Sequence, residues 1–221
     1  MSKRLLFEKT RNGVWISHLD LMRLFQRAFK RGGLNLKHTQ GFSPRAVVSI
    51  ALPLSVGVES KCEILDFELV GQEELSNEEI KNRLNATMPV GVRVTEVYDS
   101  DVKIKHLCYL DCVITLEYDN GIPEGAEEAI RALFARESVV VTKKGKNGLT
   151  EQDTIPMIRS VEVKPVSGQE LAISARICAQ NPSLNPAQMV SAIEHYCPEY
   201  KPDFAKIRRE EVRTSDGTTF R

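Results

Sequence analysis

Two short motifs that start helices divide the first hundred residues into alternating strand and helix segments. Ser17-His-Leu-Asp20 and Ser76-Asn-Glu-Glu79 both have the form of a capping box, in which a serine and an acidic residue three positions later satisfy free backbone N–H groups. Runs with strand composition flank the two motifs, at about 3–9, 46–52, 62–70 and 92–98. The order strand, helix, strand, strand, helix, strand predicts a ferredoxin-like antiparallel sheet with its helices on one face.

The second half shows the same alternation without repeating the residues of the first half. After the polar stretch 99–105, the pattern predicts a strand at 107–118, a helix from Pro123, strands near 138–143, 155–164 and 171–179, a helix from Asn185-Pro186 and a strand at 204–213. A hairpin loop is expected at 145–148. We therefore predict an α+β protein of two tandem ferredoxin-like α/β sandwiches with antiparallel sheets, the domains spanning 1–100 and 101–221.

The composition favours a globular protein without a membrane segment. The 221 residues are 42% hydrophobic and 27% charged, and no apolar run reaches the roughly 18 residues that a spanning helix needs. The first residues lack the pattern of a signal peptide, so we expect a cytoplasmic protein. Five scattered cysteines favour reduced thiols. Cys108 and Cys112 have the first spacing of a radical SAM cluster loop, but Thr115 stands at the third position, so we predict no metal site and no cofactor.

Positive charge is concentrated near the N-terminus of a chain that is neutral overall. Residues 1–45 hold ten basic and two acidic residues, a net charge of +8. At about 100° per residue, the helix after Ser17 has an apolar face formed by Leu21, Met22, Phe25, Ala28 and Phe29. Its opposite face carries four basic residues, Arg23, Arg27, Lys30 and Arg31. This stripe can follow phosphates, although a solvated helix face gives the same pattern.

His18 falls on the apolar face of this helix, close to its start. The helix dipole there disfavours a charged imidazolium, so a neutral ring is available as a base or hydrogen-bond partner. The alternative is a core histidine that holds the connection 34–45. Asp20 lies about 200° around the helix axis from His18, which argues against a conventional dyad of the two.

The stretch Gln40-Gly-Phe-Ser-Pro-Arg45 combines a flexible glycine, an aromatic ring, a hydroxyl and a guanidinium just before a strand. Arg45 can make a bidentate contact to a phosphate or carboxylate, and Phe42 can stack on a base. The alternative is a turn in which Phe42 enters the core and Arg45 pairs with a carboxylate of the acidic segment 46–100. The residues alone leave both interpretations open.

Four stretches resemble the bacterial radical SAM-associated, or radical SAM-linked, protein family: Ser17–Arg23, Gln40–Arg45, Leu52–Ser60 and Ile155–Val163. The resemblance covers nearly the whole chain. It implies a family of unknown function whose members are encoded beside, or fused to, a radical SAM protein, often near ribonuclease and ribosomal-protein genes. It marks as candidate site residues His18, Asp20, Arg23, Gln40, Gly41, Phe42, Ser43, Pro44 and Arg45, with Glu59 and Arg159 further away. The resemblance assigns no chemical role to any of them.

From these observations we expect an accessory of a radical SAM enzyme that has no catalytic activity of its own and binds or presents RNA, such as tRNA or rRNA, for modification. The expected binding residues are His18, Asp20, Arg23, Arg27, Gln40, Gly41, Phe42, Ser43 and Arg45. In this hypothesis the arginines contact phosphates and Phe42 stacks on a base. Two alternatives remain: an RNA-processing or RNA-modifying enzyme that uses His18, and a scaffold that binds only the radical SAM protein.

Overall fold

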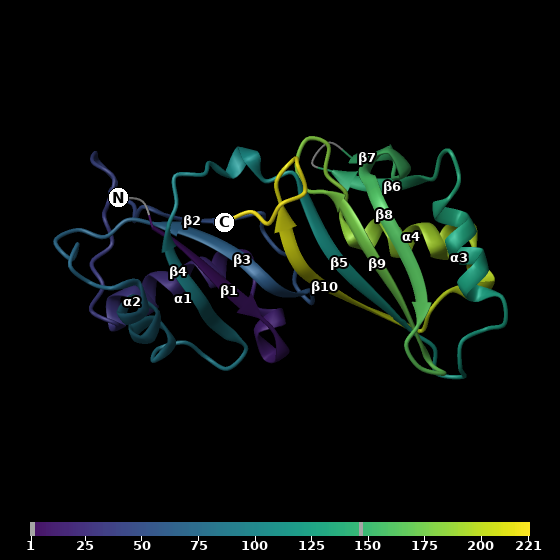
Figure 1. The fold of residues 1–221 in the computed structure, drawn as a ribbon, viewed down its shortest axis with the longest axis horizontal. Coiled ribbons are helices and arrows are strands. Elements are labelled where there is room, and N and C mark those ends of the chain that lie inside the picture. Colours follow the sequence, from purple (N-terminus) through teal and green to yellow (C-terminus); the bar gives the residue numbers. More distant parts are fainter. Residues whose placement is uncertain (1–2, 146–147) are drawn as a thin grey trace. The chain divides into compact units, whose positions relative to one another are not determined.

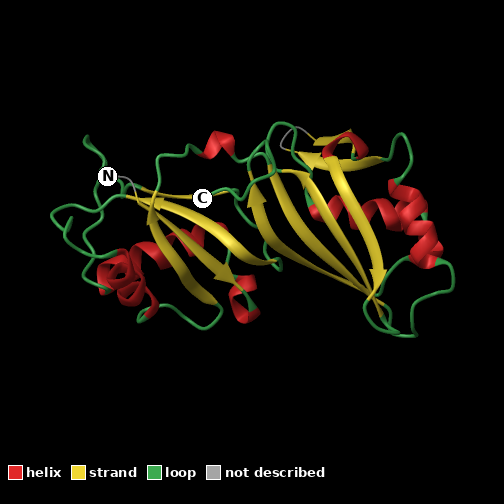
Figure 2. Cartoon of the chain, in the orientation of Figure 1, coloured by secondary structure: helices red, strands yellow, loops and turns green. Residues whose placement is uncertain are grey.

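The computed structural model describes residues 3–145 and 148–221, which form two compact units. One unit holds the chain up to Ile104 together with Arg221, and the other holds Lys105–Phe220. Across the described residues, each unit contains two α-helices and a mostly antiparallel sheet (Figures 1 and 2). This confirms the predicted antiparallel α+β class.

The first unit alternates strands and helices in the predicted order. Its elements are β1 (Lys3–Lys9), α1 (His18–Arg31), β2 (Val48–Ala51), β3 (Glu59–Phe67), α2 (Asn77–Asn85) and β4 (Val92–Asp99). A 3-10 turn, η1 (Arg11–Trp15), precedes α1, and another, η2 (Ile104–His106), follows β4. The strands lie in the order β4-β1-β3-β2, and each neighbouring pair is antiparallel. The first and third strands therefore form the centre of the sheet.

The core of this unit lies between the sheet and its two helices. Leu5 and Phe7 of β1 face α1, where the rings of Phe7 and Phe25 meet edge to face with centroids 4.7 Å apart. From α2, Ile80 and Leu84 are fully buried in the same apolar cluster. Because both helices bury their apolar residues against one set of strand residues, α1 and α2 cover the same face of the sheet.

The second unit has the same strand order with one insertion. Its elements are β5 (Tyr109–Glu117), α3 (Ala126–Phe134), β6 (Val140–Gly145), β7 (Gly148–Asp153), β8 (Ile158–Pro165), β9 (Glu170–Cys178), α4 (Pro186–Tyr196) and β10 (Phe204–Arg213). The main sheet runs β10-β5-β9-β8, while β6 and β7 form a separate two-stranded hairpin. Without that hairpin, the order of strands and helices matches the first unit.

The structure corrects several of the predicted segments. The strand expected at 62–70 is β3, which begins three residues earlier; Leu69 and Val70 instead pair with the segment at 34–36. The helix expected from Pro123 begins at Ala126, because Gly125 adopts a left-handed φ of 82° and Pro123 belongs to the preceding turn. Strand β7 was missed entirely; its residues, Gly148–Asp153, are largely polar. Of the predicted hairpin loop at 145–148, residues 146 and 147 lie outside the described residues.

The five cysteines are free thiols, and all except Cys108 are buried. Cys112 lies on the buried side of β5, and burial raises the pKa of its thiol to about 12. Within residues 3–145 and 148–221, the helices are too short or too polar to cross a lipid bilayer.

Candidate functional site

The start of α1 is built by its own sequence. The Ser17 hydroxyl oxygen accepts a hydrogen bond from the Asp20 backbone N–H at 3.2 Å and donates one to the Asp20 carboxylate at 2.7 Å. That carboxylate also pairs with Arg23 at 3.0 Å. The hydrogen bond from Ser17, followed by that from Arg23, lowers the pKa of Asp20. Asp20, which we expected to bind a ligand, is therefore occupied as a helix-capping residue.

The exposed face of α1 carries an excess of positive charge. Arg23, Arg27, Lys30 and Arg31 are all exposed, as the helical pattern predicted. Of these, Arg23 pairs with Asp20, while Arg27, Lys30 and Arg31 make no ion pair with any residue that the structure describes. Cations without an acidic partner keep their charge available for a bound anion.

The segment that follows α1 folds back on itself as a short hairpin. The Val47 N–H donates to the Lys37 carbonyl at 2.7 Å, and the Thr39 N–H donates to the Arg45 carbonyl at 2.8 Å. The Arg45 N–H in turn donates to the Thr39 hydroxyl at 3.0 Å. These bonds make residues 40–44 the tip of the hairpin. Gly41 has a φ of 133° there, and no atom lies within 4 Å of where a Cβ would be. Glycine is therefore favoured at this position by the backbone conformation and not by a lack of space for a side chain.

Phe42 projects from this tip with a relative exposure of 112%, so its ring contacts essentially no other part of the described chain. The alternative in which Phe42 enters the core is wrong. Arg45 has no ion pair among the described residues, so the proposed pairing with a carboxylate of 46–100 is wrong as well. Both side chains are thus exposed and unpaired among the described residues.

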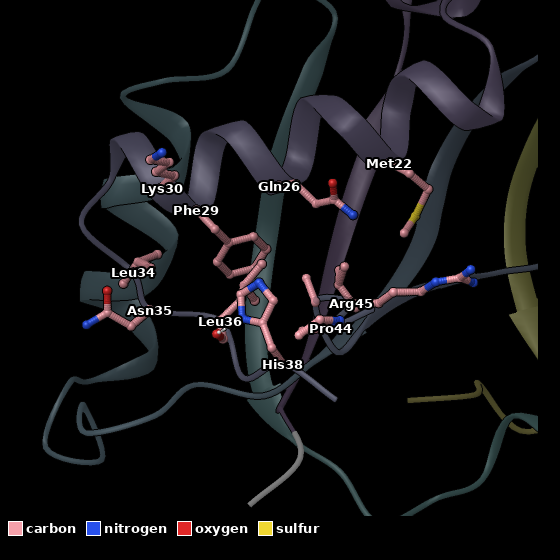
Figure 3. A pocket seen from close by; sticks show the side chains of 12 residues that line it. Met22, Gln26, Phe29, Lys30, Leu34, Asn35, Leu36, His38, Pro44 and Arg45 are labelled. Carbon is pink, nitrogen blue, oxygen red and sulfur yellow. Dashed lines mark hydrogen bonds between the residues drawn. The ribbon is translucent and has the colours of Figure 1, made fainter. Parts of the chain in front are cut away.

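Between α1 and this hairpin lies a groove with a volume of about 780 Å³ (Figure 3). In Figure 3, Met22, Gln26 and Phe29 point from α1 toward the segment that carries Leu36, His38 and Arg45. The described lining contains apolar side chains, two amides, an imidazole and two cations, and it contains no carboxylate. The lining residues are Met22, Gln26, Phe29, Lys30, Leu34, Asn35, Leu36, His38, Pro44, Arg45, Ala46 and Val48. This composition suits a ligand that is apolar in part and negatively charged in part.

His38 also lines the groove, although the sequence analysis did not mark it as a candidate. A hydrogen bond fixes which of its two ring nitrogens carries a proton. Its Nδ1 lies 3.0 Å from the Leu36 carbonyl oxygen, which can only accept, so Nδ1 carries the proton. In the neutral ring, Nε2 is then a hydrogen-bond acceptor. The signal that could have found His38 is the alternation Leu34, Leu36, His38, which directs these three side chains to one side of an extended segment.

The structure brings together only part of the expected site. Of the candidate site residues in the first motif, namely His18, Asp20 and Arg23, none lines the groove: His18 is half-buried at the first position of α1, and its ring has no hydrogen bond to any described residue. His18 is thus not the satisfied core histidine of the alternative interpretation. Arg23 and Arg27 lie on the exposed helix face. From the second motif, Pro44 and Arg45 line the groove, while the exposed hairpin tip carries Gln40, Gly41, Phe42 and Ser43.

Two other charged clusters have structural explanations. Arg4 is 3% exposed and makes a bidentate pair with Asp66 at 2.6 and 3.1 Å, together with a hydrogen bond to the Val102 carbonyl, so it ties the segment after β4 to the sheet. In the second unit, Asp111 accepts hydrogen bonds from Arg176 at 2.7 Å and Arg213 at 2.5 Å. Burial acts to raise the pKa of Asp111, but these hydrogen bonds outweigh it and lower that pKa.

The fold and groove define this chain as an α+β protein of two compact units with a cationic, carboxylate-free groove on the first. It belongs to the family described as "Uncharacterized protein conserved in bacteria (DUF2344)", whose model matches residues 3–186. No curated protein matches this chain.

Two solved structures show a related fold. A chain in the crystal structure of a Cbf5-Nop10-Gar1 complex is similar with a TM-score of 0.52 and 9% identity over 95% of this chain and 48% of that one. A chain in the structure of an H/ACA RNP bound to a substrate RNA containing 2'-deoxyuridine has a TM-score of 0.50 and 10% identity over 98% of this chain and 48% of that one. The present chain thus spans about half the length of each of these two chains, and at this identity the likeness concerns the fold alone.

Proposed function

We propose that this protein is a noncatalytic accessory that binds RNA through the first unit and presents it to a radical SAM enzyme. The observation that carries the proposal is the groove between α1 and the 37–47 hairpin, whose described lining has Lys30 and Arg45 and no carboxylate. We include in the proposal that the two units are tandem ferredoxin-like domains and that the protein acts in the cytoplasm.

The exposed charges of α1, together with Arg45 across the groove, support binding of a phosphate backbone. Arg27 and Arg31 on α1 join Lys30 and Arg45 to give four exposed cations without an ion pair among the described residues. Phosphate contacts by lysine and arginine supply most of the affinity of non-specific nucleic-acid binding. Phe42, exposed on the adjoining hairpin tip, adds an aromatic surface on which an unpaired base can stack.

The shared fold gives separate, coarser support for RNA. One of the two structures described above is an H/ACA RNP bound to a substrate RNA. The radical SAM partner rests on the family resemblance of the motifs around His18 and Phe42. The alternative enzyme using His18 has less support, because the nearest acidic residue in the motif, Asp20, is held by Ser17 and Arg23.

Titration of the purified protein with structured tRNA and rRNA fragments at low and moderate salt tests the proposal. We expect binding that weakens steeply as salt rises. Absence of binding, or binding indifferent to salt, would contradict it. Chemical change of the RNA by the protein alone, lost in His18→Ala, would favour the enzyme alternative.

The partner is tested separately by co-purification with the radical SAM protein in the presence of nuclease. An association that survives nuclease, from a protein that binds no RNA, would support the scaffold alternative instead.

A further inference from the structure

We infer that the groove between α1 and the 37–47 hairpin holds one unpaired nucleotide, so that the protein selects single-stranded RNA over duplex. This inference rests on the proposed function, because it names the form of RNA that the same surface takes. It assigns the apolar floor and the amide groups to the base, and Lys30 and Arg45 to the flanking phosphates.

The floor of the groove fits the flat face of a base. Leu36 and Val48, both half-buried, contribute apolar surface, with Met22 on the side of α1. The volume of about 780 Å³ lies within the range of small-molecule sites. A base in a duplex cannot reach such a floor, since its two faces are stacked on neighbouring bases and its edge is paired.

Free hydrogen-bonding groups surround this floor. The side-chain amides of Gln26 and Asn35 make no hydrogen bond with the rest of the described chain, so each offers a donor and an acceptor. His38 adds an acceptor at Nε2 when its ring is neutral, because Nδ1 donates to the Leu36 carbonyl. A set of donors and acceptors around an apolar floor is what recognition of an exposed base edge needs.

The cations lie where the backbone of such a nucleotide would leave the groove. Lys30 comes from the last turn of α1, and Arg45 comes from the opposite wall, next to the hairpin tip. Phe42 on that tip is then available to the next base along the strand. Charge alone would favour binding of duplex RNA, because a duplex carries more phosphates per unit length. A preference for single-stranded RNA would therefore indicate that a base occupies the groove.

The experiment compares a short mixed-sequence single-stranded RNA with its own duplex at one salt concentration. We expect the full-length protein to bind the single strand about tenfold more tightly than the duplex. Gln26→Trp fills the groove from an exposed helix position without removing a cation, and should abolish this preference. Asn82→Trp, at an exposed position on α2 outside the groove lining, is the matched control and should keep the preference.

The outcomes separate the inference from the proposed function. Equal binding of both RNAs, or a preference that survives Gln26→Trp, would overturn the unpaired nucleotide and leave RNA binding intact. Binding of neither RNA would overturn both. If Gln26→Trp binds neither RNA but releases the radical SAM protein, the groove holds a protein segment and the inference is wrong. Far-ultraviolet circular dichroism of each variant checks that the chain is folded.

Discussion

Replacing both cations of the groove should halve the salt dependence of RNA binding. Lys30 and Arg45 line the groove, and Arg27 and Arg31 are two further exposed cations of α1; none of the four has an ion pair among the described residues. With one phosphate on each, the slope of log K against log salt is about −2.8 for a single strand, at about −0.7 per phosphate. Lys30→Gln with Arg45→Gln leaves two contacts and a slope of about −1.4. Glutamine keeps the side chains polar and of similar length, so the change is mainly one of charge.

These slopes translate into a measurable difference. Between about 50 and 200 mM salt, the unchanged protein should lose about 50-fold in affinity and the double variant only about 7-fold. Fluorescence anisotropy with a labelled single-stranded RNA measures both values. At low salt the double variant should also bind more weakly than the unchanged protein, because two phosphates are no longer neutralised.

A charge-matched control distinguishes a local site from a general effect of net charge. Arg93→Gln with Lys103→Gln removes the same charge from two exposed positions of the same unit that do not line the groove. We expect this control to keep the slope near −2.8 within about half a unit. A control that flattens the salt dependence as much as the groove variant, or a groove variant that keeps the full slope, would refute a local phosphate site at the groove.

Three further predictions concern the stability of the fold. Ser17→Ala removes the cap that accepts from the first turn of α1, and should lower the free energy of unfolding by about 1 kcal/mol in urea titrations; an unchanged midpoint would contradict the capping role. Asp111→Asn should lower the free energy of unfolding by about 1–2 kcal/mol at neutral pH, because Asp111 accepts hydrogen bonds from both Arg176 and Arg213. The pKa of Asp111 is lowered in the folded state, so the contribution of Asp111 to folding stability is present above its unfolded pKa near 4 and is lost as pH falls through the lowered pKa. The variant should therefore lose less stability in acid than the unchanged protein. The same acid profile in both proteins would argue against the ion cluster. Gly91→Ala should lower the free energy of unfolding by about 1–3 kcal/mol, because the φ of Gly91 is 94° and a Cβ there would lie 2.4 Å from the Thr10 carbonyl oxygen. An unchanged temperature of thermal unfolding would contradict this expectation.

Helix α1, which forms one wall of the groove, is held against the sheet by buried aromatic side chains. Phe25 and Phe29 fix α1 to the sheet, with the rings of Phe29 and Phe67 4.9 Å apart. The other wall is attached through the backbone, since the Lys37 N–H donates to the Glu68 carbonyl at 2.8 Å. The tip at 40–44 lies beyond the hydrogen bonds that close the hairpin. Phe42 is therefore held by the backbone of the hairpin tip and not by packing of its ring against the described residues.

Much of the architecture was predictable because its signals are local. Ser17 and Ser76 both cap helices as their motifs indicated, with the Glu79 N–H donating to the Ser76 hydroxyl at 3.1 Å. The apolar face of α1 is buried at Leu21, Phe25, Ala28 and Phe29, as a repeat of 3.6 residues requires. Met22, assigned to that face, instead lies at its edge and lines the groove. Edge positions of a helix are where the pattern is least informative, because neighbouring segments decide what covers them.

Strand boundaries were less predictable than helix starts. The apolar pair Leu69 and Val70 looks like the end of a strand, but Leu36 and Asn35 are its partners. Glu59, Ser60 and Lys61 look too polar for a strand, yet Ser60 is fully buried beside Lys9 of β1. Strand propensity describes how a side chain fits its neighbours, and those neighbours are distant in the sequence.

By itself, the sequence determined where the first helix starts, which of its faces is buried and which is basic, since each of these depends on residues within one or two turns of each other. Tertiary structure alone decided that Lys30, His38 and Arg45 line one groove. That arrangement depends on backbone bonds between 37 and 47 and between 37 and 68, which link residues far apart in the chain. The two motifs indicated which segments of the chain form the site, but only the tertiary fold placed α1 and the 37–47 hairpin on opposite sides of one groove.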